Sequence, residues 1–339
     1  MGGGLDIMSA ASRKLTQSKI VPFIVVGVIF VIVPLIVPSF FQTLFTRVLI
    51  YALFAMSLNL IWGYTGLISL GHAAYFGIGS YVTSILIVSY SIDSFWLIII
   101  CAIIVTAIMA AFFGIIALRV SGLYFLLVTL ALGQLVYFVS LAWRDMTGGQ
   151  SGIFGVLYPD LGISGIPWNA TYLYFLVLVI LGVCVYIMYR ILQSPFGQAL
   201  VGIRENKRRM RAFGYNTWLY SYITFIIAGV FAGIAGVLFS YYLRGTTLTQ
   251  TSLTMSTIVL LMVILGSTRV FWGPILGAVI VVLLEYFVGS IIPARWPMVL
   301  GAIFIISVIF LRGGIAIYLE KFWKKLSHQN QTASDRPTT

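Results

Sequence analysis

The sequence predicts an all-α fold, a polytopic transmembrane helical bundle of about ten spans with both termini in the cytoplasm and a short cytoplasmic helix. The first observation is composition: 61% of the 339 residues are hydrophobic and only 8% are charged, against roughly 25% charged in a soluble domain. The second is a series of long apolar stretches, and the third is an uneven distribution of lysine and arginine. Together they indicate a protein whose solvent is lipid.

A helix needs about 20 mainly apolar residues to cross a hydrocarbon core of roughly 30 Å. Two of the predicted spans are unusual, because the third is rich in glycine and polar residues and the eighth is short. The gap between the fifth and sixth spans is long enough to contain a short re-entrant segment. In chain order, the ten predicted spans are 20–38, 44–62, 65–90, 95–118, 121–142, 170–191, 217–243, 254–267, 272–292 and 296–312.

The basic residues orient this bundle. If the N-terminus lies in the cytoplasm and the spans alternate, 16 of the 20 lysines and arginines fall on the cytoplasmic side. Such an excess is typical of cytoplasmic loops, so it favours an even number of spans. We therefore expect a cytoplasmic N-terminal segment at 1–19, a transmembrane domain at 20–312 and a cytoplasmic tail at 313–339. The net charge of +12 then reflects membrane orientation rather than binding to nucleic acid.

Motifs for catalysis and nucleotide binding are missing from the sequence. It contains no Gly-x-x-x-x-Gly-Lys phosphate loop, no His-Glu-x-x-His zinc motif and no Gly-x-Ser-x-Gly nucleophile motif. Two cysteines and two histidines are too few for most metal sites. We therefore expect a protein that is not an enzyme and that needs no cofactor or metal of its own.

The longest predicted cytoplasmic loop, at 193–216, carries a dense basic cluster. Pro195 interrupts the preceding span, a helix can form over 196–213, and Gly214 with Asn216 ends that helix. A short helix of this kind either binds anionic lipid headgroups or docks a cytoplasmic partner, and composition leaves both readings open. Its charged residues are Arg204, Glu205, Lys207, Arg208, Arg209 and Arg211.

The segment 63–81 is unusually rich in glycine for a predicted span. Small residues at four-residue spacing allow close helix packing, whereas glycine also permits a broken helix that lines a cavity. A second stripe of small residues, at 228–236, predicts another helix–helix contact. A buried histidine is more commonly a packed, hydrogen-bonded residue than a proton carrier. The candidate residues of this segment are Gly63, Gly66, Ser69, Gly71, His72, Gly77 and Gly79.

Glu285 is the only acidic residue well inside a predicted span. An ionisable residue at such depth is costly, which makes it a candidate functional residue. It is equally compatible with a structural partner for an arginine or with a place near the outer end of its helix. A single acid gives limited support to an ion-coupled carrier, which usually needs a relay or a cage of ion ligands.

Four stretches of the sequence resemble motifs of one family. The run GYTGLISLGHAAYFGIGSY at 63–81 resembles the signature of permeases from prokaryotic branched-chain amino acid ABC transporters, especially their M-type subunit. The sequence TGGQSG at 147–152 resembles their external loop. Residues 204–216, followed by the small-residue stripe, resemble their ATPase-coupling loop, and 266–277 resembles their late Gly-Pro motif. In order, these matches cover most of 44–312.

The resemblance implies a membrane subunit of an ATP-driven importer in the plasma (inner) membrane of a prokaryote. The implied partners are a second homologous permease, two cytoplasmic ATPase subunits, an external solute-binding protein, membrane lipid and amino acid cargo, with no nucleic acid. The glycine-rich residues named above would then shape the pathway or pack the helices. The residues implied to couple to the ATPase are Arg204, Glu205, Asn206, Arg208, Arg209, Gly214 and Asn216.

The sequence departs from the family at two places. The run 207–211 is basic where relatives have a small, partly acidic stretch, and 311–314 replaces a turn that resembles Arg-Pro-Arg-Gly. The first departure implies either an unusual ATPase pairing or an acidic partner surface. Urea and short-amide permeases look very similar, so the cargo stays open between these compounds and branched-chain amino acids. A secondary carrier that uses Glu285 is the alternative from another class.

Overall fold

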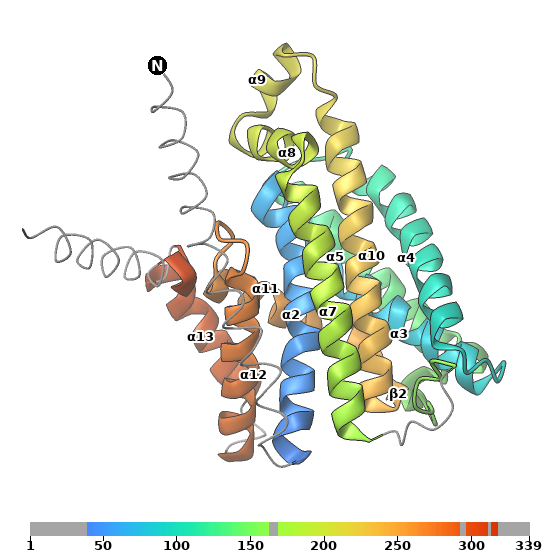
Figure 1. Cartoon of the computed structure of the whole chain (residues 1–339). Helices are drawn as coiled ribbons and strands as arrows, with labels where there is room; N and C mark the ends of the chain where they lie inside the picture. Colours follow the sequence, from blue (N-terminus) through green and yellow to red (C-terminus); the bar gives the residue numbers. More distant parts are fainter. Residues whose placement is uncertain (1–38, 163–168, 292–295, 311–312, 318–339) are drawn as a thin grey trace, which may run out of the picture.

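The computed structural model describes residues 39–162, 169–291, 296–310 and 313–317, and its helical bundle confirms the predicted all-α class (Figure 1). The predicted first span at 20–38 and the segment 1–19 lie outside the described residues, as does most of the predicted tail. The elements are α2 (Ser39–Thr65), α3 (His72–Val88), α4 (Phe95–Ala117), α5 (Leu123–Ala142), α6 (Arg144–Thr147), η1 (Gly149–Ser151), β1 (Ile153–Phe154), α7 (Ala170–Gln193), α8 (Pro195–Glu205), α9 (Lys207–Ala212), α10 (Thr217–Leu243), β2 (Gly245–Thr246), η2 (Leu248–Thr251), α11 (Leu253–Gly266), α12 (Gly273–Ile291) and α13 (Trp296–Phe310).

Within the described residues, each of the other nine predicted spans corresponds to a helix. Six of these helices, α2, α4, α5, α7, α10 and α12, are long and apolar enough to cross a membrane. In contrast, α3, α11 and α13 have 17, 14 and 15 residues. At about 1.5 Å per residue they are shorter than a hydrocarbon core of roughly 30 Å. The total of about ten crossing spans therefore remains a prediction.

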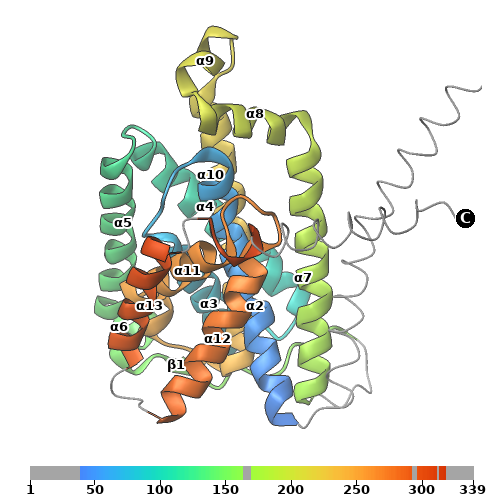
Figure 2. The ribbon, with the colours of Figure 1, turned by 90° about the vertical axis from the view of Figure 1, so that its left-hand side faces the viewer.

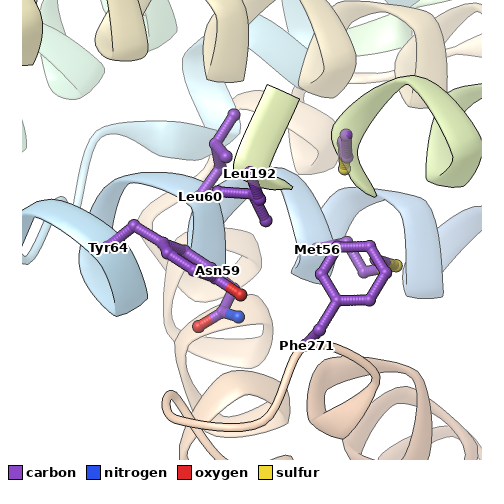
Figure 3. Close-up of a pocket in the computed structure, with 7 residues that line it drawn as sticks. Met56, Asn59, Leu60, Tyr64, Leu192 and Phe271 are labelled. Atoms are coloured by element: carbon purple, nitrogen blue, oxygen red, sulfur yellow. The ribbon is translucent and has the colours of Figure 1, made fainter. Parts of the chain in front are cut away.

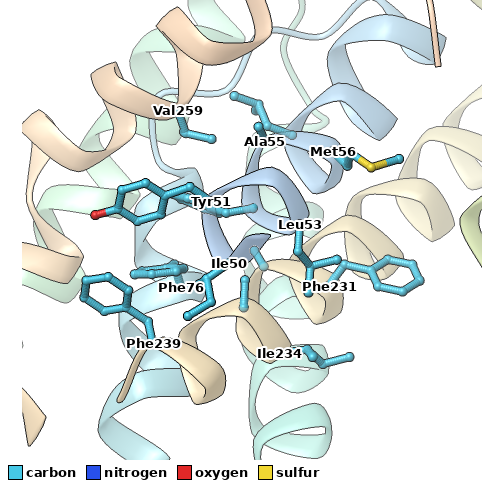
Figure 4. Packing of buried hydrophobic residues seen from close by; sticks show 14 of the residues in the cluster. Ile50, Tyr51, Leu53, Ala55, Met56, Phe76, Phe231, Ile234, Phe239 and Val259 are labelled. Atoms are coloured by element: carbon cyan, nitrogen blue, oxygen red, sulfur yellow. The ribbon is translucent and has the colours of Figure 1, made fainter. Parts of the chain in front are cut away.

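Helices α2 and α10 form the centre of the bundle. Most of their side chains are buried, whereas α4, α5, α7 and α12 bury a third or fewer of theirs. α10 packs along α2, α3 and α4, and α2 also contacts α7 and α12. Tyr51, Phe76 and Phe239 join three of these helices in the core, with ring centroids 5.2 to 6.4 Å apart (Figure 4). Tight packing around α2 thus fixes the positions of the elements at its two ends.

The two ends of the bundle carry different structures. At one end α8 lies across the helices and α9 projects beyond it (Figures 1 and 2). At the opposite end β1 pairs antiparallel with β2, with Ile153 opposite Thr246. The predicted cytoplasmic loop and the predicted external loop are therefore on opposite ends of the bundle, as the charge-based orientation predicts.

Candidate functional site

The loop 193–216 forms two helices rather than the single helix expected over 196–213. α8 begins at Pro195, whose fixed backbone suits the first helical position. Asn206 then takes an extended conformation, with φ −154° and ψ 95°. Its side-chain Oδ1 accepts a hydrogen bond of 3.0 Å from the Arg209 amide, which is an N-cap. Asn206 therefore starts α9 and divides the loop.

Gly214 and Asn216 have different roles at the end of the loop. Gly214 terminates α9 in the left-handed region, at φ +85°, and the Tyr215 amide donates to the Met210 carbonyl at 3.1 Å, as in a helix C-cap. Asn216 instead accepts a 3.2 Å hydrogen bond from the Leu219 amide and so caps the start of α10. The expected C-cap role is confirmed for Gly214 and was wrong for Asn216, because the next helix begins immediately after it.

One face of α8 is docked on the bundle, whereas α9 is exposed. Leu200 and Ile203 are buried, and α8 contacts α2, α7 and α10. α9 buries none of its residues and lies beyond α8, away from the ends of the spans (Figures 1 and 2). The loop therefore combines a docked helix with an exposed tip, a name used below for α9.

The exposed tip is strongly basic. Among the described residues, the only ion pair within 4.0 Å joins Arg47 and Glu285, so no cation of the tip has an acidic partner there. Arg211 donates from Nε to the Thr217 hydroxyl at 3.1 Å. Partial burial, and then the charge of Arg211, lower the pKa of Lys207 from its usual value. The positive charges of the exposed tip therefore repel one another. They belong to Lys207, Arg208, Arg209 and Arg211.

A shallow depression lies beside the exposed tip. Its volume is about 360 Å³. Aromatic side chains surround this part of the loop, since Tyr215, Trp218 and Phe213 are 41%, 39% and 70% exposed. Exposed aromatic residues beside arginine are typical of protein contact surfaces. The depression is lined by Arg211, Gly214, Tyr215, Asn216, Thr217 and Trp218.

Arg204 connects the loop to the glycine-rich segment. Its Nη1 donates a hydrogen bond to the carbonyl of Gly63, near the end of α2. The last carbonyls of a helix have no intrahelical partners, and the helix dipole favours cations there. A Cβ built on Gly66, where φ is +77°, would lie 3.4 Å from Cγ of Arg204. The structure therefore brings together two predicted sites that are 141 residues apart.

The segment 63–81 is an interrupted helix. α2 ends at Thr65, residues 66–71 are not helical, and α3 begins at His72. The expected span at 65–90 is therefore wrong at its start, because glycine at 66 and 71 tolerates the turn between the helices. The backbone is broken as one of the two readings expected, while a role in lining a pathway stays a prediction.

Helix α5 holds the non-helical stretch in place. The Leu70 amide donates to the Thr129 hydroxyl at 3.2 Å. A Cβ on Gly71 would lie 2.0 Å from the Thr129 carbonyl oxygen, so only glycine permits this approach. Ser69 is buried, and its hydroxyl has no hydrogen-bond partner among the described residues. This stretch therefore combines a tight backbone contact with an unsatisfied polar group.

Gly77 and Gly79 lie at close contacts of α3. A Cβ on Gly77 would come within 2.1 Å of Cγ2 of Thr251, and one on Gly79 within 2.1 Å of the Gly233 carbonyl oxygen of α10. A Cβ on Gly236 of α10 would lie 1.9 Å from the carbonyl oxygen of Phe76 in α3. Real Cβ atoms essentially never approach within 3.0 Å. A side chain at Gly79 or Gly236 would therefore overlap backbone atoms, whereas one at Gly77 would have to displace the Thr251 side chain. These contacts favour the packing alternative for both residues and for the small-residue stripe of α10, and their role stays a prediction.

His72 is a packed, hydrogen-bonded residue. It is fully buried, and its ring stacks on Phe54 with centroids 5.7 Å apart. The Ser57 hydroxyl donates to the Phe54 carbonyl at 2.7 Å and lies 2.8 Å from Nε2 of His72. The Ser57 hydroxyl and Nε2 of His72 therefore share a hydrogen bond whose donor is set by the tautomer of the ring. Nδ1, on the other side of the ring, has no hydrogen-bond partner among the described residues.

Glu285 has the structural partner that one reading expected. Its Oε1 lies 2.7 Å from Nη2 of Arg47, and the two side chains are 21% and 25% exposed. Arg47 also lies over the ring of Tyr51, 5.2 Å from its centroid. Among the described residues, no group of three or more His, Cys, Asp or Glu side chains is close enough to hold an ion. The position of Arg47 could not be anticipated, because it lies 238 residues away in the chain.

A small pocket lies between α2, α7 and the turn before α12 (Figure 3). Its volume of about 10 Å³ is enough for roughly one water molecule and far too small for an amino acid. Oδ1 of Asn59 is buried here and has no hydrogen-bond partner in the part of the chain that the structure describes, a feature that nothing in the sequence pattern indicated. The lining residues are Met56, Asn59, Leu60, Tyr64, Met188, Leu192 and Phe271.

Comparison with known proteins adds to this geometry. The permease protein LivM of the high-affinity branched-chain amino acid transport system of Salmonella typhimurium is 27% identical over 259 residues, covering 70% of this chain and 61% of that protein. LivM of Escherichia coli matches to the same extent. The probable branched-chain amino acid transport permease protein LivM of Methanocaldococcus jannaschii is 28% identical over 235 residues. The match covers 57% of this chain and 65% of that protein.

The chain spans 61% of the length of the two bacterial relatives. These relatives are transport permeases rather than enzymes.

No solved structure matches the chain significantly. A family model described as the permease component of the branched-chain amino acid transport system matches residues 40–308. This range contains all of α2 except its first residue, every helix from α3 to α12 and most of α13. The chain therefore belongs to the family of permease components of branched-chain amino acid transport systems.

Proposed function

We propose that this protein is a permease subunit of an ATP-driven importer for branched-chain or related hydrophobic amino acids. The observation that carries the proposal is the loop 193–216, in which a docked helix presents an exposed basic tip at one end of the family's bundle. Arg204 attaches this loop to the end of the central helix α2. Such an arrangement suits a subunit that receives motion from a partner rather than one that works alone.

In this proposal the chain assembles with a second homologous permease and two cytoplasmic ATPase subunits. An external solute-binding protein delivers the cargo. ATP binding moves the loop, the spans tilt, and the pathway opens to one side of the membrane at a time. Shifting a gate from 1:99 to 99:1 takes about 5.5 kcal/mol of differential binding, which nucleotide binding on the partner chains supplies. The coupling contact consists of Glu205, Asn206, Arg208, Arg209, Gly214 and Asn216, with Arg204 behind it.

The proposal includes a topology for the whole chain. The protein crosses the plasma (inner) membrane of a prokaryote about ten times, and 20–38 is the first crossing. Residues 1–19 and 313–339 lie in the cytoplasm, on the same side as the loop 193–216. The excess of lysine and arginine on that side supports this orientation.

The charge of the exposed tip defines the chemistry of its partner. Four cations in a six-residue helix repel one another, and an acidic partner surface relieves that repulsion and raises the lowered pKa of Lys207. The tip projects beyond the ends of the spans (Figure 1), so it faces a cytoplasmic protein more directly than the headgroups around the bundle. We therefore assign the tip to an acidic surface on the ATPase.

Co-purification from the native host in mild detergent tests this assignment. The tagged wild-type protein should bring down a P-loop ATPase and a second, similar permease. Arg208→Gln combined with Arg209→Gln should reduce ATPase recovery about tenfold, because each loses a charged contact. Arg119→Gln combined with Arg269→Gln is the control, since both arginines are exposed and lie outside the loop. A wild-type protein that comes down alone, or equal recovery with both variants, contradicts the docking role.

Replacing Gly214 by valine should reduce ATP-driven uptake while the bundle remains folded. At φ +85° a side chain costs about 1–2 kcal/mol, and a Cβ here meets no atom of the described residues within 4 Å. The strain therefore shifts the exposed tip without disturbing the core, and uptake in proteoliposomes of the assembled transporter should fall about 5- to 30-fold. Gly162→Val is the matched control, because Gly162 has φ +77° and equal space outside the loop 193–216. Normal uptake by Gly214→Val argues against the coupling role.

Two alternatives differ from this proposal in cargo or in energy source. A permease for urea or short amides would have the same loop, and direct binding assays on the cognate solute-binding protein separate the two cargo classes. An ion-coupled carrier would depend on Glu285, whose pairing with Arg47 instead supports a structural role. Transport that survives ATP depletion and disappears in Glu285→Gln would favour the carrier.

A further inference from the structure

We propose that Arg204 is the positioning residue through which motion of the loop 193–216 reaches the membrane-spanning helices. This inference rests on the proposed function, because it assigns a route to the same coupling event. It concerns the side of α8 that faces the bundle, whereas the partner contact concerns the exposed tip. The two surfaces are therefore separable by substitution.

The route begins where the exposed tip is fixed to α8. The Asn206 amide donates to the Gly202 carbonyl at 3.0 Å, and Met210 of the tip fits over Gly202, since a Cβ there would lie 2.7 Å from the methionine sulfur. Leu200 and Ile203, both buried, then fix α8 against the bundle. A partner that displaces the tip therefore displaces α8.

Arg204 carries this displacement across to a junction of three elements. Its guanidinium is bonded to the Gly63 carbonyl of α2. A Cβ on Gly63 would lie 2.6 Å from the Thr268 carbonyl oxygen, in the turn between α11 and α12. The Cγ atom of Arg204 lies beside Gly66, which is the first residue of the non-helical stretch that leads into α3. One side chain thus contacts the end of the central helix and the start of the interrupted one.

The chemistry of the contact suits a connection that must hold during movement. The Gly63 carbonyl is one of the last in α2, so no helical amide competes for it. A guanidinium has five N–H donors in a fixed fork and remains charged, so it can keep a donor on this carbonyl through small rotations of α8. The end of α2 at Gly63 is also packed closely against the backbone of Thr268. Close packing of this kind transmits a displacement instead of absorbing it.

The test measures ATP hydrolysis and amino acid uptake together in proteoliposomes that contain the complete transporter. Arg204→Ala should leave the co-purified ATPase in place and hydrolysing, while uptake per ATP falls about tenfold through loss of a charge-assisted hydrogen bond. Arg204→Lys, which still places an N–H donor on the carbonyl, should restore uptake per ATP to within about threefold of wild type. Arg119→Ala, which removes an exposed arginine from the turn between α4 and α5, should match wild type.

The outcomes separate this inference from the proposed function. If the wild-type complex shows no ATP-dependent uptake, the proposed function fails and the inference fails with it. If wild type transports and Arg204→Ala keeps the wild-type ratio of uptake to hydrolysis, only the inference is overturned. Loss of ATPase recovery in both Arg204→Ala and Arg204→Lys would make Arg204 a docking residue and would also overturn it. Should Arg204→Ala fail to fold, a normal ratio in Arg204→Met, which keeps a long side chain but has no N–H donor, overturns the inference.

Discussion

Replacing Gly79 by leucine is expected to prevent α3 and α10 from packing and to cost about 3 kcal/mol or more. A Cβ at this position would lie 2.1 Å from the carbonyl oxygen of Gly233 and 2.8 Å from its Cα. These are backbone atoms of a central helix, so no side-chain rotation relieves the overlap, and the two helices must separate. That cost is a large share of the roughly 5–15 kcal/mol that stabilises a typical fold. Thermal unfolding in detergent and the yield of monodisperse protein measure the effect.

Gly182→Leu is the matched control for this substitution. Gly182 is exposed in the middle of α7, and a Cβ there meets no atom within 4 Å. Leucine also has a higher helix propensity than glycine, so this variant should express and melt at or above the wild-type temperature. If Gly79→Leu were to melt like Gly182→Leu, the close contact between α3 and α10 would be incorrect.

Breaking the pair between Arg47 and Glu285 should be the second large effect. Removing one partner leaves the other charge in an apolar setting. We expect Arg47→Met or Glu285→Leu alone to cost about 2–4 kcal/mol, towards the lower end because both side chains keep 21–25% exposure. The double variant Arg47→Met with Glu285→Leu should recover most of the loss, since two apolar side chains need no partner. A double-mutant cycle of unfolding free energies measures this coupling.

The same variants distinguish a structural pair from a transport site. If the pair only joins α2 to α12, the double variant keeps ATP-driven uptake near the wild-type level. Additive losses of stability in the double variant would show that the two side chains do not interact, against the 2.7 Å contact. Loss of uptake in a fully stable double variant would instead return Glu285 to the pathway.

Long apolar helices were the most predictable part of the fold. The span expected at 95–118 forms α4 over Phe95–Ala117, and the one at 217–243 forms α10 with the same bounds. In lipid, the backbone N–H and C=O groups of an apolar run must form hydrogen bonds within the protein. A single segment meets this requirement by forming a helix. The pattern itself therefore determines these elements.

The breaks in the helices were harder to predict. Glycine at 66 and 71 is compatible with both a packed helix and a turn, so only the contact with α5 decides between them. Asn206 divides the loop 193–216 because its side chain caps a new helix, although asparagine is also tolerated inside a helix. In such cases the local preference is weak, and tertiary contacts determine the outcome.

The candidate site was predicted as two separate segments, and their connection was not. Arg204 and Gly63 each belonged to a predicted motif, yet their contact spans 141 residues of chain. Arg47 belonged to no predicted motif, and its partner Glu285 lies 238 residues away in the chain. One sequence contains no signal for such long-range pairs, because each depends on how several helices pack around α2.

The burial of α2 also affects how the protein is made. During synthesis α2 emerges before α7, α10 and α12, the helices that cover it. Until they arrive, the charged side chain of Arg47 and the amide of Asn59 face lipid or the insertion machinery. The buried environment of α2 is therefore complete only after α10 and α12 have been synthesised, so the last third of the chain determines the packing of its first described helix.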